Sequence, residues 1–291
     1  MHTEDLLLGV RGGRLEVRDA ASGRCVPAPE VAYARMSTPL LSTDREITLL
    51  RHLEGMGTVL LNPIDAVLAC VNKFWQLQTL ALALAGLPVP DTLTYAHGPL
   101  DRVLDAVRGP CVVKAVRGHR GQQVFLAEDT ALLREVAGSL DQRVPYAFQH
   151  YVRHSHGRDL RVIVVDGRAV TAQVRAASDG GITSNLARGG TATLCPGLHP
   201  AAERLAERAA RALGMVVSGV DLLFEPDGAF TVCEVNVNVA WRATMPTVAP
   251  AIADACRARL RAHPAPPGPH AGDATSRPGP PDRPREPRPP A

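Results

Sequence analysis

Between residues 73 and 260 the chain alternates between hairpin-forming and helix-forming patterns, and this alternation limits the folds that it can adopt. Asp166-Gly167 is a strong two-residue hairpin signal between two apolar stretches. Glu225-Pro-Asp-Gly228 marks a second turn between strand-like stretches. Helical patterns lie before, between and after these turns. The sequence therefore predicts an α+β fold rather than a single doubly wound parallel sheet.

Apolar spacing, together with glycine and proline breakers, locates the expected elements. Helices are expected at 45–54, 74–85, 100–107, 132–140, 200–213 and 252–260. Strands are expected at 6–10, 15–17, 58–61, 111–116, 123–126, 146–152, 160–165, 169–175, 220–224 and 230–236.

Pattern and composition divide the chain into three parts. Residues 1–70 are expected to form a small N-terminal unit, and residues 71–263 hold the longer alternation of strands and helices. The Pro/Arg-rich tail at 264–291 has 11 prolines in 28 residues and no apolar periodicity. Such a segment cannot bury enough apolar surface to offset its chain entropy, so the tail is predicted to be disordered.

Charge and apolar distribution argue against several classes of protein. With 32 basic and 29 acidic side chains, the formal net charge is only +3, whereas nucleic-acid-binding domains are usually strongly basic. Apolar runs stop short of the ~18 residues of a membrane span, and the acidic N-terminus is unlike a signal peptide. The six cysteines form no CxxC pair. We therefore expect a cytoplasmic protein with reduced thiols and with no nucleic-acid or membrane partner.

Lysine is nearly absent from this chain. Of the 32 basic residues only Lys73 and Lys114 are lysines, which leaves 30 arginines. Lysine is a compact point charge, suited to a phosphate oxygen. Lys114 lies in an apolar strand and precedes the loop Gly118-His-Arg-Gly121, whose glycines allow backbone N–H groups to approach phosphate. The alternatives are chance survival of two lysines and an ordinary edge-strand lysine.

The last predicted hairpin places oxygen-bearing side chains on one face. If Phe224 pairs with Ala229, Asp221 faces Val232 and lies diagonal to Glu234. Asn236 shares that face, and such a set of oxygen donors suits Mg²⁺ or Mn²⁺. A one-residue change in the turn would break this convergence, and the alternative is a solvated face.

Asp159 and Arg161 share one face of the preceding predicted hairpin. In ideal register, with Val165 opposite Arg168, Arg175 falls on the other face, so its placement beside them requires a bulge or a position at the strand end. A polar loop then runs from Thr183 to Gly190. Its donors can meet phosphate or a carboxylate, or can face solvent.

Nine stretches, taken together and in order, resemble the ATP-grasp superfamily and, within it, the RimK-like amino-acid (α-L-glutamate) ligases. They are 62–63, 71–73, 86–90, 112–114, 149–152, 157–162, 183–190, 217–222 and 233–236. The resemblance implies an ATP-grasp fold: a pre-ATP-grasp N-terminal domain at 1–70, a central lid subdomain at 71–152 and a C-terminal subdomain at 153–263.

The resemblance also implies a role for each candidate residue. Lys73 and Lys114 are expected to bind the nucleotide phosphates, and Gly118 and Gly121 are expected to belong to the glycine-rich lid. Adenine is assigned to Gln149, His150 and Tyr151, ribose to Asp159, and the closing loop to Thr183, Ser184 and Asn185. Two Mg²⁺ or Mn²⁺ ions are assigned to Asp221, Glu234 and Asn236, and the acyl phosphate to Arg161 and Arg175.

The implied reaction is an ATP- and Mg²⁺-dependent ligation. In the first step ATP phosphorylates an acceptor carboxylate, which gives an acyl phosphate and ADP. In the second step the amine of an amino acid, expected to be L-glutamate, attacks the acyl phosphate, which gives an amide and phosphate. The acceptor is a small molecule, a peptide or a protein, and a homo-oligomer is possible. Two alternatives remain: a peptide-modifying ATP-grasp enzyme that forms side-chain amides or esters, and a non-ligating ATP-binding regulatory protein.

The chain departs from the family pattern in three motifs, and its N-terminal unit is also expected to be shorter than the family's usual N-terminal domain. His150 stands where the family usually has Glu, and Thr183 stands where it usually has Arg. Asn238-Val-Ala240 replaces the usual Ser-Pro-Gly. These changes fall near the expected adenine, loop and substrate contacts, so the amino acid and the acceptor stay open.

Overall fold

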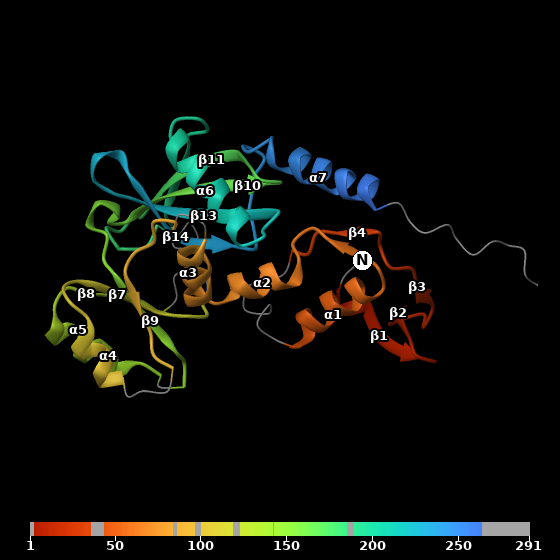
Figure 1. Ribbon diagram of the computed structural model, residues 1–291, viewed down its shortest axis with the longest axis horizontal. Coiled ribbons are helices and arrows are strands. Elements are labelled where there is room, and N and C mark those ends of the chain that lie inside the picture. The colour runs from red at the N-terminus through yellow and green to blue at the C-terminus, as the bar shows by residue number, and fades with distance from the viewer. Residues whose placement is uncertain are drawn as a thin grey trace, which may run out of the picture.

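The structure is a computed structural model, and it describes residues 3–35, 44–83, 86–96, 100–118, 123–141, 143–184 and 189–263. Gly121, Asn185 and the tail at 264–291, about which the sequence makes predictions, lie outside these ranges. Helices and sheets are mixed along the chain, which confirms the predicted α+β class (Figure 1).

The N-terminal part contains two small sheets and two helices. A 3-10 turn at Thr3–Asp5 leads into an antiparallel sheet in the order β1-β2-β3, formed by β1 (Leu6–Arg11), β2 (Arg14–Asp19) and β3 (Cys25–Val26). β4 (Val31–Ala32) pairs in parallel with β5 (Val59–Leu60), with α1 (Asp44–Gly55) between them in sequence. α2 (Ile64–Val71) completes this part.

The helix α2 was not predicted, because the pair Asn62-Pro63 was interpreted as the end of a strand. Pro63 instead occupies the N-cap position of α2, a place before a helix where its fixed φ angle is tolerated. Five of the eight helix residues are buried, so α2 shows no polar face from which its period could be recognised.

The central sheet has the order β6-β9-β7-β8. Its strands are β6 (Thr92–Leu93), β7 (Cys111–Ala115), β8 (Val124–Ala127) and β9 (Tyr146–His150), and its helices are α4 (Leu100–Ala106) and α5 (Thr130–Ser139). Cys111, Val113 and Ala115 of β7 pack in one buried cluster with residues of α4 and α5. Since side chains alternate along a strand, Lys114 faces away from these helices.

The C-terminal sheet has five strands in the order β12-β11-β10-β13-β14. They are β10 (Arg158–Val165), β11 (Arg168–Ala176), β12 (Thr191–Leu194), β13 (Val217–Phe224) and β14 (Phe230–Asn236). The remaining helices are α3 (Lys73–Leu82), α6 (Pro200–Ala212) and α7 (Val248–Ala262), and 3-10 turns lie at Arg153–Ser155 and Pro226–Gly228.

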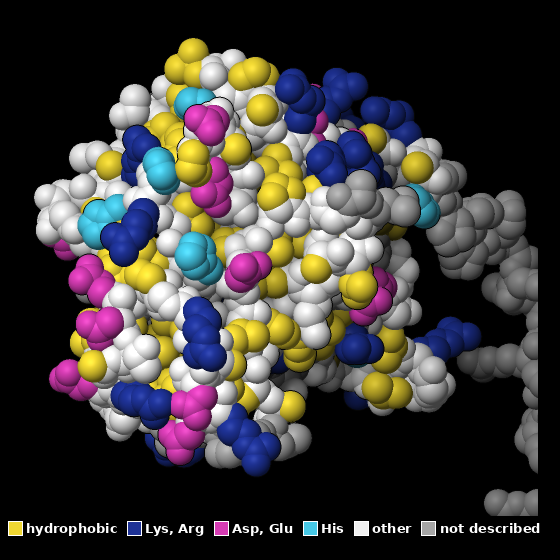
Figure 2. All heavy atoms as spheres, turned by 60° about the vertical axis from the view of Figure 1, so that its left-hand side comes forward, with side chains coloured by type: hydrophobic (Ala, Val, Ile, Leu, Met, Phe, Trp, Pro, Cys, Tyr) yellow, Lys and Arg dark blue, Asp and Glu magenta, His cyan; other side chains and the backbone are white. Residues whose placement is uncertain are grey.

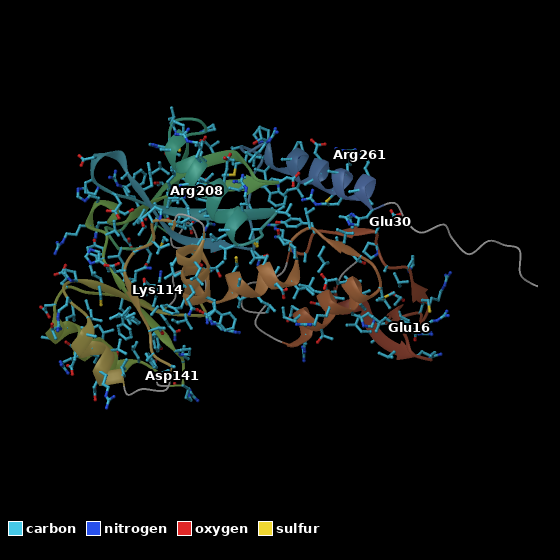
Figure 3. All side chains as sticks on the ribbon, viewed as in Figure 1. Glu16, Glu30, Lys114, Asp141, Arg208 and Arg261 are labelled. Carbon is cyan, nitrogen blue, oxygen red and sulfur yellow. The ribbon has the colours of Figure 1, made fainter. Side chains whose placement is uncertain are left out.

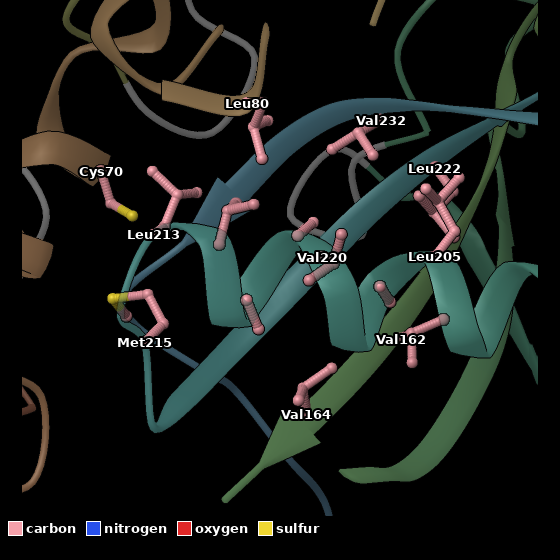
Figure 4. Close-up of a cluster of buried hydrophobic side chains, with 14 of the residues drawn as sticks. Cys70, Leu80, Val162, Val164, Leu205, Leu213, Met215, Val220, Leu222 and Val232 are labelled. Atoms are coloured by element: carbon pink, nitrogen blue, oxygen red, sulfur yellow. The ribbon is translucent and has the colours of Figure 1, made fainter. Parts of the chain in front are cut away.

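The two faces of this sheet are covered differently. Val162, Val164 and Val220 pack against α6 in the largest buried cluster (Figure 4). On the opposite face Ile163 and Val165 pack with residues of α7. The rest of that opposite face carries charged and polar side chains, which form the candidate site described below.

A bulge in each hairpin sets which side chains meet on this polar face. In β10–β11 the register shifts between Ile163 and Val164, which aligns Asp159 with Arg175, as the sequence prediction required. In β13–β14 the predicted register was wrong, because Phe224 pairs with Phe230 rather than with Ala229. A second bulge next to Leu222 then places Asp221 directly opposite Glu234 instead of diagonal to it.

Several boundaries also differ from the predictions. β10, β13 and α7 begin two to four residues earlier than expected, and the short strands β3, β4, β6 and β12 were not predicted. All four residues of β12 are exposed, so no apolar alternation marks it. The six cysteines are free thiols. Within the described ranges, no helix combines the length and the apolar character needed to cross a membrane.

Asn62 joins the N-terminal part to the C-terminal sheet. Its Nδ2 donates to the carbonyl of Val217 at 2.9 Å, and its Oδ1 accepts from the backbone N–H groups of Val216 and Val217 at 3.0 and 2.8 Å. Because Asn62 is 3% exposed, these bonds are shielded from water and hold the two parts together.

Candidate functional site

Four polar side chains lie side by side across four adjacent strands. Gln173 on β11 pairs with Arg161 on β10, Arg161 pairs with Asp221 on β13, and Asp221 pairs with Glu234 on β14. We call these four residues the polar row. Cross-strand partners project to the same face of a sheet, so the row is a continuous polar strip.

Two arginines and two aspartates form a buried charged cluster on and beside the polar row. Arg161 donates to both carboxylate oxygens of Asp221, each at 2.6 Å. Arg175 donates to both oxygens of Asp159, one of them at 2.7 Å, and its Nη2 lies 3.1 Å from Asp221 Oδ2. These planar two-point contacts are the strong form of ion pair. The structure thus brings together the predicted residues Asp159, Arg161, Arg175 and Asp221.

The two aspartates respond differently to this environment. Burial by itself raises the pKa of Asp221, but Arg161 and Arg175 outweigh burial and hold that pKa below its ordinary value. Burial and the neighbouring charge of Asp221 keep the pKa of Asp159 above its ordinary value, although Arg175 opposes the rise. Asp221 is therefore the firmly ionised carboxylate of the cluster.

Lys73 connects the end of the polar row with the glycine loop. Its Nζ lies 3.3 Å from Glu234 Oε1 and donates to the carbonyl of Gly118 at 3.0 Å. Lys73 is the first residue of α3, whose N-cap Asn72 accepts hydrogen bonds from the next turn of the helix. The helix start therefore fixes the backbone of Lys73 and aims its ammonium at the polar row.

Lys114, labelled in Figure 3, belongs to the central sheet, and its side chain reaches β14, the strand that carries Glu234. It is only 5% exposed; its Nζ donates to Gln149 Oε1 at 2.8 Å and lies 4.0 Å from Cys233 Sγ. Cys233 precedes Glu234 on β14, so both lysines of the chain meet neighbouring residues of one strand. Gln149 also donates to Thr92 Oγ1 at 3.0 Å, which fixes its amide.

The other predicted nucleotide contacts lie near the end of β9, at the start of β10 and in the loop after β11. The backbone N–H groups of His150 and Tyr151 already donate to Asp91 and Pro110 carbonyls, at 2.7 and 3.1 Å. Asp159 has both oxygens bound to Arg175. Thr183 is half-buried and Ser184 is buried. The adenine, ribose and loop assignments remain predictions.

The oxygen-bearing side chains Asp221, Glu234 and Asn236 fit a Mg²⁺ or Mn²⁺ ion by their chemistry. Asn236 Nδ2 donates to Asp221 Oδ2 at 3.1 Å, and Asp221 lies directly opposite Glu234. Two carboxylates and an amide are hard oxygen ligands. A cation bound here replaces contacts that Arg161 and Arg175 make with Asp221.

Sequence reasoning missed two residues of this region, Gln173 and Cys233. Gln173 lies two residues before Arg175 on β11, so the two side chains project to the same face of the sheet. Its place on the polar face was therefore deducible once the bulge in β10–β11 was known. Cys233 resembled an ordinary apolar strand residue. Burial raises the pKa of its thiol, which therefore stays protonated beside Lys114.

The face of the molecule in Figure 2 carries charges of both signs. Acidic and basic side chains lie next to one another on the face shown in Figure 2, with histidines between them. The net charge of +3 is consistent with this mixture. Recognition of an anionic ligand must therefore come from individual side chains rather than from the overall charge.

Comparison with known proteins gives consistent matches. The chain is 43% identical to beta-citrylglutamate synthase B of Homo sapiens over 243 residues, which are 82% of this chain and 62% of that protein. It is 44% identical to N-acetylaspartylglutamate synthase A of Mus musculus over 219 residues, 74% of this chain and 57% of that protein. The chain thus spans only about three fifths of the length of these relatives.

The fold also matches solved structures. One is the ATP-grasp ligase PsnB complexed with a phosphomimetic variant of minimal precursor, Mg and ADP, with a TM-score of 0.59, 22% identity, and coverage of 88% of this chain and 86% of that one. The expected ATP-grasp fold is therefore confirmed. The model of the RimK-like ATP-grasp domain matches residues 70–255, which contain both lysines and the whole polar row. The chain therefore belongs to the RimK-like ATP-grasp family.

Proposed function

We propose that this protein is an ATP- and Mg²⁺-dependent ligase that activates an acceptor carboxylate as an acyl phosphate and joins L-glutamate to it, with release of ADP and phosphate. The observation that carries the proposal is the meeting of Lys73 and Lys114 at neighbouring residues of β14, beside the carboxylates of Asp221 and Glu234. Ammonium groups and oxygen ligands at one place suit a metal–nucleotide complex.

Each predicted residue keeps its proposed role. Lys73 and Lys114 bind the nucleotide phosphates, with Gly118 and Gly121 in the covering loop. Gln149, His150 and Tyr151 contact adenine, Asp159 contacts ribose, and Thr183, Ser184 and Asn185 close over the nucleotide. Asp221, Glu234 and Asn236 hold one or two Mg²⁺ or Mn²⁺ ions, which when bound offset charge on the phosphate oxygens. Arg161 and Arg175 hold the acyl phosphate.

The division of the chain also belongs to this proposal. Residues 71–152 act as a lid and residues 153–263 as the subdomain that carries the acid cluster. Closing the lid excludes water, which otherwise hydrolyses an acyl phosphate. The contacts of Lys114 with Cys233 and of Lys73 with Glu234 support this arrangement, because they join the two subdomains around one space.

The choice of L-glutamate rests on the relatives. Both synthases named above have glutamate in the name of their product, and the rest of each product name is a carboxylic acid, citrate or N-acetylaspartate. These two acids are the first acceptors to test here.

The test is a coupled ADP assay with ATP, Mg²⁺, L-glutamate and either citrate, N-acetylaspartate or a short peptide, followed by mass spectrometry of the product. We expect ADP release only when the amino acid and an acceptor are both present. The Glu234→Gln variant, which keeps the size of the side chain, is expected to bind ATP weakly with Mg²⁺ and to abolish turnover. ATP binding without turnover across the acceptors contradicts the ligase and favours a regulatory protein.

A further inference from the structure

Gln173 is a buried polar side chain that the proposed roles leave unused. It is 6% exposed, it lies on the polar face of β11, and it occupies one end of the polar row. Arg175 is two residues further along the same strand. Within the described ranges, the amide of Gln173 makes no hydrogen bond or ion pair to a protein group, and it is not among the side-chain atoms sealed from solvent without a partner. The polar atoms of its amide therefore keep some contact with solvent on the polar face.

The other members of the polar row all have partners in the protein. Arg161 and Asp221 bind each other, and Glu234 contacts Lys73. A largely buried amide without a protein partner is unfavourable, because at 6% exposure Gln173 keeps little of the hydrogen bonding to water that it has in the unfolded chain. Its presence beside a fully paired charge cluster points to a ligand that supplies the missing bonds.

The place of Gln173 in the sheet indicates which ligand this is. Glu234, at the other end of the polar row, lies beside the two lysines assigned to the nucleotide phosphates. Three strand spacings separate β14 from β11, which is roughly 14 Å. Gln173 is thus too far from these lysines to share their phosphates, and it lies at the end of the polar row away from the proposed nucleotide phosphates.

The charges nearby define the chemistry of the contact. Arg161 and Arg175 are paired with Asp221 and Asp159, so the cluster beside Gln173 carries no excess charge, and a ligand contact at Gln173 itself is made through neutral hydrogen-bonding groups. An amide offers one donor group and one acceptor oxygen close together. An α-amino acid presents the complement, a carboxylate oxygen and an amine N–H.

We propose that Gln173 binds the incoming amino acid, with Nε2 donating to its carboxylate and Oε1 accepting from its amine. This inference rests on the proposed function. It makes Gln173 a specificity-determining residue for the amine substrate, because a ligand without this donor and acceptor leaves the amide unpaired.

The test compares Gln173→Leu and Gln173→Glu with the wild type in the ADP assay, using ATP, Mg²⁺, L-glutamate and citrate or N-acetylaspartate. Gln173→Leu is expected to raise the KM for L-glutamate at least tenfold, with the KM for ATP and for the acceptor within twofold. Its Tm is expected to stay level or rise, because no internal hydrogen bond is lost. Gln173→Glu removes the donor and repels the substrate carboxylate, so it is expected to raise the same KM. Gln78→Leu, on the exposed side of α3, is the matched control.

The outcomes separate the two proposals. An inactive wild type overturns the proposed function, and this inference with it. An active wild type with an unchanged KM for L-glutamate in Gln173→Leu overturns the inference alone. So does an equal rise in all three KM values together with a lower Tm, which is the signature of a structural role.

Discussion

Asp221 is buried among cationic side chains, and its ionised state depends on them. Two oxygens of one carboxylate accept from Arg161, and Arg175 and Asn236 add further contacts. Buried carboxylates remain charged only when they are paired in this way. The same oxygens are the proposed metal ligands, so the guanidinium of Arg161 and a divalent cation compete for one carboxylate.

This competition predicts that Arg161→Gln binds Mn²⁺ more tightly than the wild type in the absence of nucleotide. Displacing a charge-assisted hydrogen bond costs about 1.5 kcal/mol, so the gain in affinity is expected to be about tenfold. Electron paramagnetic resonance of free Mn²⁺ measures it directly. Arg168→Gln, at an exposed position on β11, is the control. Equal affinities in the two variants contradict the competition.

Lys114 is enclosed more tightly than a surface cation. Its Nζ donates to Gln149 Oε1 at 2.8 Å and leaves little space for a planar fork. Lys114→Arg therefore keeps the charge but misplaces it, and we expect kcat/KM for ATP to fall at least tenfold, or about 1.4 kcal/mol. Arg117→Lys at an exposed position is the reverse control. Full activity in Lys114→Arg would show that a lysine is not required at this position, and that its retention in an arginine-rich chain is a matter of chance.

The buried thiol of Cys70 makes the fold sensitive to alkali. Burial, with a contribution from Glu234, raises the pKa of Cys70 from 9.0 to about 12. Above pH 9 the unfolded chain ionises this thiol while the folded chain keeps it protonated, so stability falls as the pH rises towards 12. The loss is about 1.4 kcal/mol per pH unit. In Cys70→Ala, urea unfolding between pH 10 and 11 is expected to show a shallower decline than in Cys25→Ala, the exposed control.

The hairpin β13–β14 depends on an unusual turn. Pro226–Gly228 forms a 3-10 turn in which Asp227 has φ 57°, a left-handed conformation. Aspartate tolerates this conformation better than a β-branched residue. The turn sets the pairing of Phe224 with Phe230, from which the position of Asp221 opposite Glu234 follows through the bulge.

Substitutions at Asp227 test the turn without touching the site. Asp227→Val is expected to lower the free energy of unfolding by about 1–2 kcal/mol, because its branched side chain is strained at positive φ. Asp227→Gly relieves the conformational restriction in the folded state and is expected to stay within about 1 kcal/mol of the wild type. Chemical denaturation of both variants measures the difference, and equal losses count against the strain.

Buried polar side chains join the N-terminal part and α3 to the C-terminal sheet. Asn62 bonds the start of α2 to β13, and Gln76 on α3 accepts from the backbone N–H of Val235 at 2.7 Å and donates to Cys70. Both side chains are buried. They position the N-terminal part and α3, and hence Lys73, against the sheet that carries the polar row.

Asn62→Leu is expected to destabilise the whole fold. It leaves buried backbone groups of Val216 and Val217 without partners, which costs about 2–4 kcal/mol in total. Thermal unfolding should remain a single transition with a lower Tm if the parts unfold together. A separate early transition of the N-terminal part, with the main transition unchanged, contradicts the view that Asn62 supports the sheet.

Local patterns were sufficient for the longer elements and for most of the candidate residues. Strand alternation puts Asp159 and Arg161 on one face of the sheet, and likewise Glu234 and Asn236, independent of the register with the neighbouring strand. Strong turn signals located both hairpins. The short, exposed β12 and the almost entirely apolar α2 were missed, because their residues follow no regular alternation of polar and apolar positions.

Which residues face each other across strands depended on contacts distant in sequence. The two bulges align Arg175 with Asp159 and Asp221 with Glu234, and no local pattern marks where an extra residue leaves the ladder. Packing against α6 on one face and α7 on the other selects that register, because a slip turns buried side chains towards water. The residue types of the proposed ligase site can therefore be recognised in the sequence. Their convergence on one strip of sheet, with Gln173 at its end, is decided by tertiary packing.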